Sequence, residues 1–387
     1  MSTFEDHPLV EGPITCHCWN GDRTKFAICP NNNEVHIYSK GKTGKWEMEQ
    51  TLTEHSQRVL GIDWAPKSNQ LVTCGADRNA YVWTFDPKEG AKGSWKPSLV
   101  ILRINRAATC VKWSPLENKF AVGCGDRCIS ICYFDVDNDW WVSKHIKKPI
   151  KSTVLCIDWH PNNYLVACGS ADFKARVFSG YVKEIEDKPE STPWGKKMSC
   201  GQLMAEKSNG RGEKADAKGT QGGWVHGVSF SPSGNKLAWV GHDSTVSVLN
   251  QLTDVVSTIR TKDLPYLACM FVSDNSLIVA GHDCQPLMYN HDDKDCLSLI
   301  DSLDKGKKQK SQASFSAMEK FKGLDKRAEE KAGGTDLNTV HQNAITAISI
   351  VTGERGSVKS FATSGVDGHM VVWNCKSLET AIAGLKF

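Results

Sequence analysis

The chain repeats one short pattern with fixed internal spacing. Seven times an acidic or amide residue is followed six positions later by an apolar or aromatic residue, in the pairs Asn32/Tyr38, Asp77/Trp83, Asp126/Cys132, Asp172/Phe178, Asp243/Leu249, Asp283/Tyr289 and Asp367/Trp373. In the first five copies an aromatic residue also stands thirteen positions before the acidic or amide one, at Trp19, Trp64, Trp113, Trp159 and Phe230. Three positions held in phase indicate one structural unit repeated along the chain.

Each copy has the pattern of short strands separated by turns. In the second copy, residues 59–66, 70–77 and 79–84 are apolar, partly alternating runs bounded by Pro, Asn or Gly-Ala-Asp, and residues 95–104 supply a fourth, outer strand. Successive acidic positions are 45, 49, 46 and 40 residues apart where the spacing is regular. A WD40-type β-propeller has about 40–45 residues and four strands per blade, whereas a helical solenoid needs a 3.6-residue apolar period that is absent here. The sequence therefore predicts an all-β, seven-bladed WD40-type β-propeller, with residues 1–387 as one domain.

The composition is typical of a soluble intracellular protein. The net charge is +3, no apolar stretch approaches the roughly 20 residues that span a bilayer, and residues 1–12 carry no signal-peptide pattern. The fifteen cysteines are odd in number and scattered through the expected strands. Because disulfide frameworks belong to small secreted chains, we expect reduced core cysteines in a cytosolic protein. We expect neither membrane insertion nor nucleic acid as a partner.

Motifs that carry chemistry are weak in this chain. The "GKTG" at 41–44 lacks the earlier glycine of a phosphate-binding loop, and Cys124 and Cys128 have no second pair at zinc spacing. The "GHD" at 241–243 and at 281–283 falls on expected structural turns, and no nucleophile elbow is present. We therefore expect no enzyme activity, no cofactor and no metal site, and interpret the chain as a binding surface.

Two gaps in the repeat are longer than the others. Asp172 and Asp243 are 71 residues apart, and Asp283 and Asp367 are 84 apart. The first gap predicts an insert at 187–222, polar and Gly-rich in its second half, which we interpret as a solvated, mobile loop. The second predicts an insert at 305–336 that begins with a basic stretch.

The second insert has the composition of a short amphipathic helix at 314–330. Its apolar positions recur every three residues among charged ones, which makes a slanted apolar stripe on a helix, and the stripe consists of Phe315, Met318, Phe321 and Leu324. Lys322 lies at its rim. Two interpretations stay open: the stripe folds back on the propeller, or it lies in the groove of a partner.

Basic residues concentrate in the loops that precede the first strands of the second to fourth copies. In WD-type blades these loops share one face with the turns that carry the acidic residue. The basic positions are Arg58, Arg103, Arg106, Lys148 and Lys151. They predict a face that meets an acidic partner, and a merely solvated rim is the alternative.

Longer stretches resemble one family within the WD-repeat proteins. Residues 61–83, 99–123, 138–163, 191–198 and 223–234 are similar to the WD-repeat subunit of the actin-related protein 2/3 complex, and the similarity covers nearly the whole chain. The resemblance implies a propeller that holds other subunits of an assembly that nucleates branched actin filaments. It implies that ATP binding belongs to the actin-related subunits, and that the insert helix contacts the pre-existing filament. The stretch 205–221 departs from the family pattern, which leaves the role of the first insert open.

The WD-repeat resemblance also implies a hydrogen-bonded set in two blades. In such sets an Asp bonds a His, which reaches a Thr hydroxyl and then a Trp indole; the positions here are His55, Thr73, Asp77 and Trp83 in the second copy, and His341, Thr363, Asp367 and Trp373 in the seventh. The third, fifth and sixth copies lack the Trp, so we expect their turns to depend on local Asp-to-backbone bonds.

These observations lead to a non-catalytic scaffold subunit of the actin-related protein 2/3 complex that docks on the filament through its insert helix. The expected partners are the other subunits, the actin filament and acidic segments of nucleation-promoting factors. The expected location is the cytoplasmic actin cytoskeleton at the cortex and in protrusions, with a nuclear fraction allowed. The alternative function is a WD40 adaptor that reads acidic or modified peptides on its top face.

Overall fold

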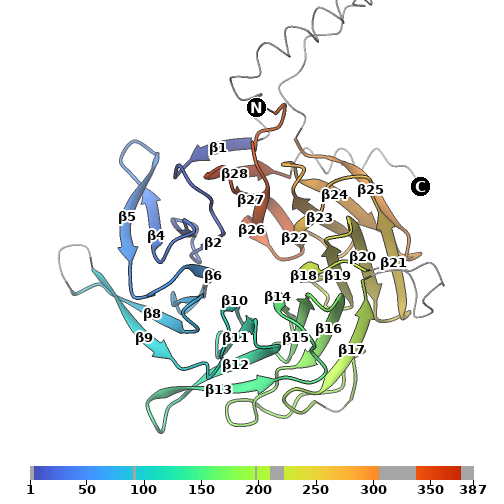
Figure 1. Ribbon diagram of the computed structural model, residues 1–387, viewed down its shortest axis with the longest axis horizontal. Helices are drawn as coiled ribbons and strands as arrows, with labels where there is room; N and C mark the ends of the chain where they lie inside the picture. Colours follow the sequence, from blue (N-terminus) through green and yellow to red (C-terminus); the bar gives the residue numbers. More distant parts are fainter. Residues whose placement is uncertain (1–3, 90–92, 197, 210–221, 305–336, 376–387) are drawn as a thin grey trace, which may run out of the picture.

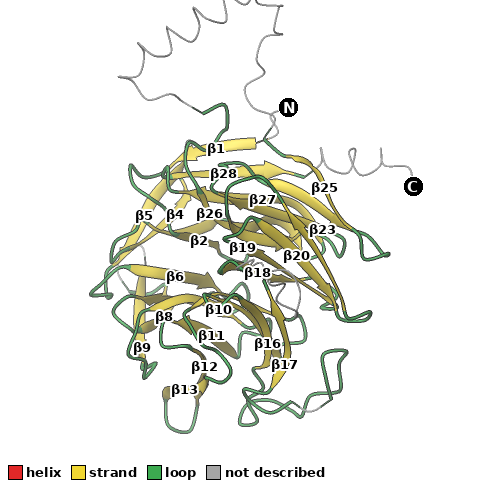
Figure 2. Ribbon diagram, turned by 45° about the vertical axis from the view of Figure 1, so that its right-hand side comes forward, coloured by secondary structure: helices red, strands yellow, loops and turns green. Residues whose placement is uncertain are grey.

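The protein forms a closed ring of seven antiparallel blades, described here from a computed structural model (Figure 1). The structure describes residues 4–89, 93–196, 198–209, 222–304 and 337–375. Each blade is a four-stranded sheet, and the described residues contain strands, turns and loops but no helix (Figure 2). The predicted all-β, seven-bladed propeller is therefore confirmed.

Six blades each use four consecutive strands, ordered from the ring axis outward. The first is β2 (Cys16–Trp19), β3 (Lys25–Cys29), β4 (Val35–Lys40) and β5 (Trp46–Leu52). The second is β6 (Val59–Trp64), β7 (Leu71–Gly75), β8 (Ala80–Asp86) and β9 (Ser94–Val100), and the third is β10 (Ala108–Trp113), β11 (Lys119–Cys124), β12 (Cys128–Asp135) and β13 (Trp140–Ile146). The fourth is β14 (Val154–Trp159), β15 (Leu165–Ser170), β16 (Lys174–Ser179) and β17 (Leu203–Ser208). The fifth is β18 (Val225–Phe230), β19 (Lys236–Gly241), β20 (Thr245–Asn250) and β21 (Val255–Arg260), and the sixth is β22 (Tyr266–Phe271), β23 (Ser276–Gly281), β24 (Leu287–His291) and β25 (Leu297–Ser302).

The seventh blade closes the ring by combining both ends of the described chain. It contains β26 (Ile345–Glu354), β27 (Ser357–Gly365) and β28 (His369–Asn374), and its outermost strand is β1 (Phe4–Pro8), which pairs antiparallel with β28. Figure 1 shows β1 beside β28. Residues 376–387 lie outside the described residues.

The repeated positions form the core between blades. The five upstream aromatic anchors are all buried, and so are the seven residues that stand six positions after each acidic or amide residue. Side chains of neighbouring blades pack in common clusters; for example, Trp64 and Trp83 of the second blade pack with Val35 of the first. The pattern follows from sheet geometry, because alternate strand residues face the two neighbouring blades.

The range 187–222 is not a single inserted loop, which corrects the sequence prediction. Strand β17 lies inside it and supplies the outer strand of the fourth blade, where it pairs with β16. Before this strand, Trp194 is buried, packs on Phe230 with ring centroids 5.5 Å apart, and donates a hydrogen bond to the carbonyl oxygen of Gly234 (2.9 Å). The strand was missed because its apolar residues, Leu203, Met204 and Ala205, are consecutive and do not alternate with its polar residues. The stretch predicted to be mobile overlaps 210–221, which lies outside the described residues.

Candidate partner-binding surfaces

The upper face of the ring is defined by two sets of segments that contact each other. The loops 53–58, 101–107 and 147–153 precede the innermost strands, and each lies against the turn that carries the acidic residue of the same blade. The backbone N–H of Ala76 donates to the Arg58 carbonyl oxygen (2.8 Å), and Gly125 donates likewise to Ala107 (2.9 Å). These bonds place the loops and the turns at one end of each blade.

All five predicted basic residues are exposed on this upper face: Arg58, Arg103, Arg106, Lys148 and Lys151. They come from three consecutive blades, so the structure brings them to one side of the ring. The Arg58 side chain donates to the Asn31 Oδ1 atom (3.2 Å). Within the described ranges, none of the five side chains forms an ion pair. We call this set the basic face.

Three arginines on the same side adopt the left-handed backbone conformation. The φ angles of Arg78, Arg103 and Arg127 are 68°, 55° and 57°. This conformation favours Gly or Asn, and a long side chain there costs on the order of 1 kcal/mol. Phe173 and Ser244 have the same conformation in the turns that correspond to those of Arg78 and Arg127. These turns therefore require a positive φ angle but not a positive charge. Arg78 and Arg127 extend the positive charge of the basic face.

Beneath this face, the second and seventh blades contain matching hydrogen-bond chains. In the second blade, His55 Nδ1 lies 2.8 Å from Asp77 Oδ2, His55 Nε2 lies 2.8 Å from Thr73 Oγ1, and the Trp83 indole N–H donates to the same hydroxyl (3.0 Å). The seventh blade repeats this chain with distances of 2.9, 2.8 and 2.8 Å among His341, Asp367, Thr363 and Trp373. Burial alone would raise the pKa of Asp77, but the His55 contact and backbone N–H donors hold it below its usual value.

Two other blades build different networks at the same place, and sequence reasoning missed them. In the fourth blade, the buried Arg176 donates to Asp172 Oδ1 (2.9 Å) and Glu206 Oε2 (2.7 Å). In the fifth, Asn209 donates to Asp243 Oδ1 (3.0 Å) and accepts from the Trp239 indole (3.2 Å). The Asp243 turn therefore depends on side chains and not only on local backbone bonds. Spacing gave no signal for Asn209, because it follows an outer strand of the preceding blade.

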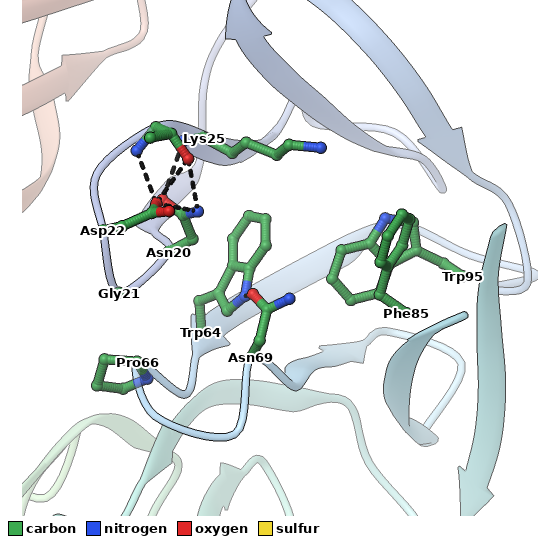
Figure 3. Close-up of a pocket in the computed structure, with 10 residues that line it drawn as sticks. Asn20, Gly21, Asp22, Lys25, Trp64, Pro66, Asn69, Phe85 and Trp95 are labelled. Carbon is green, nitrogen blue, oxygen red and sulfur yellow. Dashed lines mark hydrogen bonds between the residues drawn. The ribbon is translucent and has the colours of Figure 1, made fainter. Parts of the chain in front are cut away.

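Two of the cavities among the described residues open on the lower face. One of about 320 Å³ lies between the first and second blades, where Trp64, Phe85 and Trp95 form an aromatic wall and the loop at Asn20 and Asp22 forms the opposite rim (Figure 3). The Asp22 carboxylate accepts hydrogen bonds from Thr24 and, to a smaller extent, from Asn20, and these bonds lower its pKa. Gly21 is required here, because an added Cβ would lie 2.1 Å from the Pro66 carbonyl oxygen.

The other cavity, of about 270 Å³, lies at the lower mouth of the axial channel. Arg355, at the tip of the long β26–β27 hairpin, crosses to other blades and donates to Asp158 Oδ2 (2.6 Å) and to the carbonyl oxygens of Trp159 (3.2 Å) and Phe230 (2.9 Å). Asp158 also accepts from the Phe230 backbone N–H (2.8 Å). The hairpin therefore ties the seventh blade to the fourth and fifth.

The described residues contain no cluster of three or more His, Cys, Asp or Glu side chains arranged for a metal ion. They also include no helix with the length and apolar character needed to cross a membrane. All fifteen cysteines are free, and Cys200 and Cys296 are the exposed ones. The predicted contact residues of the second insert, Phe315, Met318, Phe321, Lys322 and Leu324, lie outside the described residues.

Comparison with known proteins agrees with this architecture. The family model described as WD domain, G-beta repeat matches residues 46–84 and 142–179. The chain is 56% identical to actin-related protein 2/3 complex subunit 1A-B of Xenopus laevis, over 98% of this chain and 99% of that protein. The chain belongs to the actin-related protein 2/3 complex subunit 1 family. It is also similar to subunit 1 of Schizosaccharomyces pombe (38% identical, over 96% of this chain and 100% of that protein) and to subunit 1B of Arabidopsis thaliana (39%, over 98% of both).

Proposed function

We propose that the protein is the non-catalytic scaffold subunit at the subunit 1 position of an actin-related protein 2/3 complex, where it supports nucleation of branched actin filaments in the cytoplasmic actin cytoskeleton. The observation that carries this proposal is the 56% identity to a curated subunit 1 over nearly the full length of both chains. A rigid ring with exposed loops on two faces suits a subunit that holds several neighbours.

The basic face is the proposed contact for acidic segments of nucleation-promoting factors. Its support is the exposure of Arg58, Arg103, Arg106, Lys148 and Lys151 and the lack of an ion pair for them among the described residues. A WD40 adaptor that reads exchangeable acidic or modified peptides would use the same face. The two functions differ in whether the partners are fixed.

Co-purification tests the assignment. We expect an affinity-tagged full chain, isolated from cytosol, to bring down a constant set of subunits in equal amounts, including two actin-related proteins. Peptide-bearing clients in variable amounts, without such a set, would support the adaptor and contradict the scaffold.

The filament contact is proposed for the helix predicted at 314–330. Its support is the sequence pattern of Phe315, Met318, Phe321 and Leu324, with Lys322 at the rim. Truncation of a buried aromatic anchor typically costs about 2 kcal/mol or more in binding, which is about thirtyfold in affinity.

We therefore expect the double variant Phe315→Ala, Phe321→Ala to assemble normally but to weaken filament binding and branch formation, measured by cosedimentation and by microscopy of branches. The variant Lys307→Ala, Lys308→Ala, in the preceding basic stretch, is the control for the apolar stripe. A destabilised propeller with normal branching would show instead that the stripe packs on the protein itself.

A further inference from the structure

Outer strands of a propeller leave one edge of backbone N–H and C=O groups without a strand partner. Such edges invite pairing with other chains, and proteins blunt them with charged residues or proline. Among the seven outer strands of the described residues, six carry a charge or a proline before their last position: β1, β5, β9, β13, β17 and β25. The exception is β21, whose sequence is VVSTIR.

The composition of β21 favours strand pairing along the centre of its free edge. Five of its six residues are uncharged, and Val, Thr and Ile have high strand propensity. Val255 is 42% exposed and Val256 is 38% exposed, although both are large apolar residues. Arg260 stands at the end of the strand and leaves its centre without charge.

The register of β20 and β21 identifies the outward-pointing groups. Leu249 pairs with Val256 and Ser247 with Thr258, and just beyond the strand the Thr261 N–H donates to the Ser244 carbonyl oxygen (3.0 Å). Bonded and non-bonded pairs alternate along an antiparallel ladder. The backbone N–H and C=O groups of Val256, Thr258 and Arg260 therefore point away from β20, and no described residue accepts a hydrogen bond from these N–H groups.

The neighbouring outer strand adds apolar surface beside this edge. Strand β25 lies next to β21 around the ring (Figure 1). Leu297 of β25 packs in the same core cluster as Ile259 of β21, so Leu299, two positions along, lies on the same side of its strand. Leu299 is 49% exposed.

We propose that β21 is an assembly edge: a β-strand from a different polypeptide adds to it through main-chain hydrogen bonds at Val256, Thr258 and Arg260. The incoming strand carries apolar side chains on the face that covers Val255 and Leu299. A strand fits this edge better than a helix because a helix satisfies its own backbone groups and leaves those of β21 unpaired. That the strand comes from another subunit rests on the proposed function.

Hydrogen exchange tests the edge in the wild-type protein. We expect the amides of Val256, Thr258 and Arg260, followed in peptides that span 252–262, to exchange at least tenfold more slowly in the purified complex than in the isolated chain. Equal exchange rates in the complex and in the isolated chain would overturn the proposal. Slow exchange in the isolated chain would overturn it too if it appears only when the chain dimerises. Failure of the wild-type chain to co-purify with a complex contradicts the proposed function and the edge together.

Two variants separate the backbone donor from the side chain. Thr258→Pro removes an outward N–H that makes no bond to β20, whereas Thr258→Val keeps this N–H; both lose the side-chain hydrogen bond to Ser247 (2.8 Å). We expect Thr258→Pro to reduce co-purifying subunits at least tenfold and Thr258→Val to leave them unchanged. The decisive case is one in which the wild-type chain co-purifies with its subunits and the two variants have equal melting temperatures. Equal amounts of co-purifying subunits with both variants would then contradict the assembly edge but not the proposed function.

Discussion

At the scale of single residues, three buried histidines, His55, His160 and His341, act as fixed hydrogen-bonding groups. His55 and His341 connect an Asp to a Thr hydroxyl in two blades. His160 in the fourth blade is used differently: its Nε2 donates to the Gly234 carbonyl oxygen (3.0 Å), and its Nδ1 accepts from the Asn162 backbone N–H (3.0 Å). Only the neutral ring can make both bonds. Burial lowers the pKa of His160 to about 4.

This histidine makes stability depend on pH in a defined direction. The unfolded chain protonates His160 near pH 6.5, whereas the folded chain resists protonation until about pH 4. Its contribution is therefore complete above pH 6.5 and is lost as the pH falls toward 4. We expect His160→Gln to be less stable at pH 7 but to lose about 2 kcal/mol less free energy of unfolding than the wild type between pH 7 and 5. Urea denaturation at the two pH values measures this, with His282→Gln as an exposed control. An unchanged pH dependence in His160→Gln would refute the assignment.

At the scale of elements, two segments of the seventh blade hold the ring together. Strand β1 pairs with β28 along five residues, and Phe4 packs on Trp373 with ring centroids 5.6 Å apart. The tip of the β26–β27 hairpin reaches the fourth and fifth blades through Arg355. The first contact closes the outer edge of the ring, and the second crosses its lower mouth.

Removal of β1 should destabilise the entire ring. Deletion of residues 1–8 leaves the backbone edge of β28 and the Trp373 ring without their partner strand. We expect the thermal midpoint to fall by several degrees, because loss of a paired strand costs several kcal/mol and each kcal/mol shifts the midpoint by about 1 °C in a domain of this size. Deletion of residues 1–3 keeps β1 and serves as the control. Equal thermal midpoints for both truncations would show that β1 contributes nothing to closure.

At the scale of the whole molecule, the ring collects charge from residues far apart in the sequence. Arg58 and Lys151 belong to the second and fourth blades, yet both lie on the basic face. The net charge of the chain is only +3, so the positive surface comes from arrangement and not from composition. Such a surface acts mainly on the rate of association with an acidic partner.

Charge reversal tests this effect. We expect Arg103→Glu, Arg106→Glu and Lys151→Glu together to slow association with an acidic peptide about tenfold or more and to weaken its dependence on salt. The fold should remain stable, since exposed charges contribute little to stability. Stopped-flow association rates at two salt concentrations measure this. The control is the triple variant Lys42→Glu, Lys45→Glu, Lys294→Glu, which changes the net charge by the same amount at exposed sites outside the basic face. Equal rates for both triple variants would indicate a solvated rim.

The sequence alone predicted the architecture because the propeller repeats its core. Residues such as Trp64, Asp77 and Trp83 recur with fixed spacing, since every blade must bury the same positions and turn at the same place. The loops that form the basic face were predictable for the same reason. The sequence also pointed to the family through stretches such as 61–83.

Other features were decided by the tertiary structure, because they join residues whose separation in the sequence does not repeat from blade to blade. Asn209 takes part in the Asp243 network, and Arg355 reaches Asp158, without any repeat that would reveal either contact. Strand β17 lacked the alternation of apolar and polar residues that predicts a strand, and its pairing with β16 is visible only in the structure. The sequence of β21 can be read directly, but only the structure shows that this strand is the outermost strand of its blade and leaves one edge unpaired. Local spacing thus determined the blades, whereas the closed ring determined which distant groups meet.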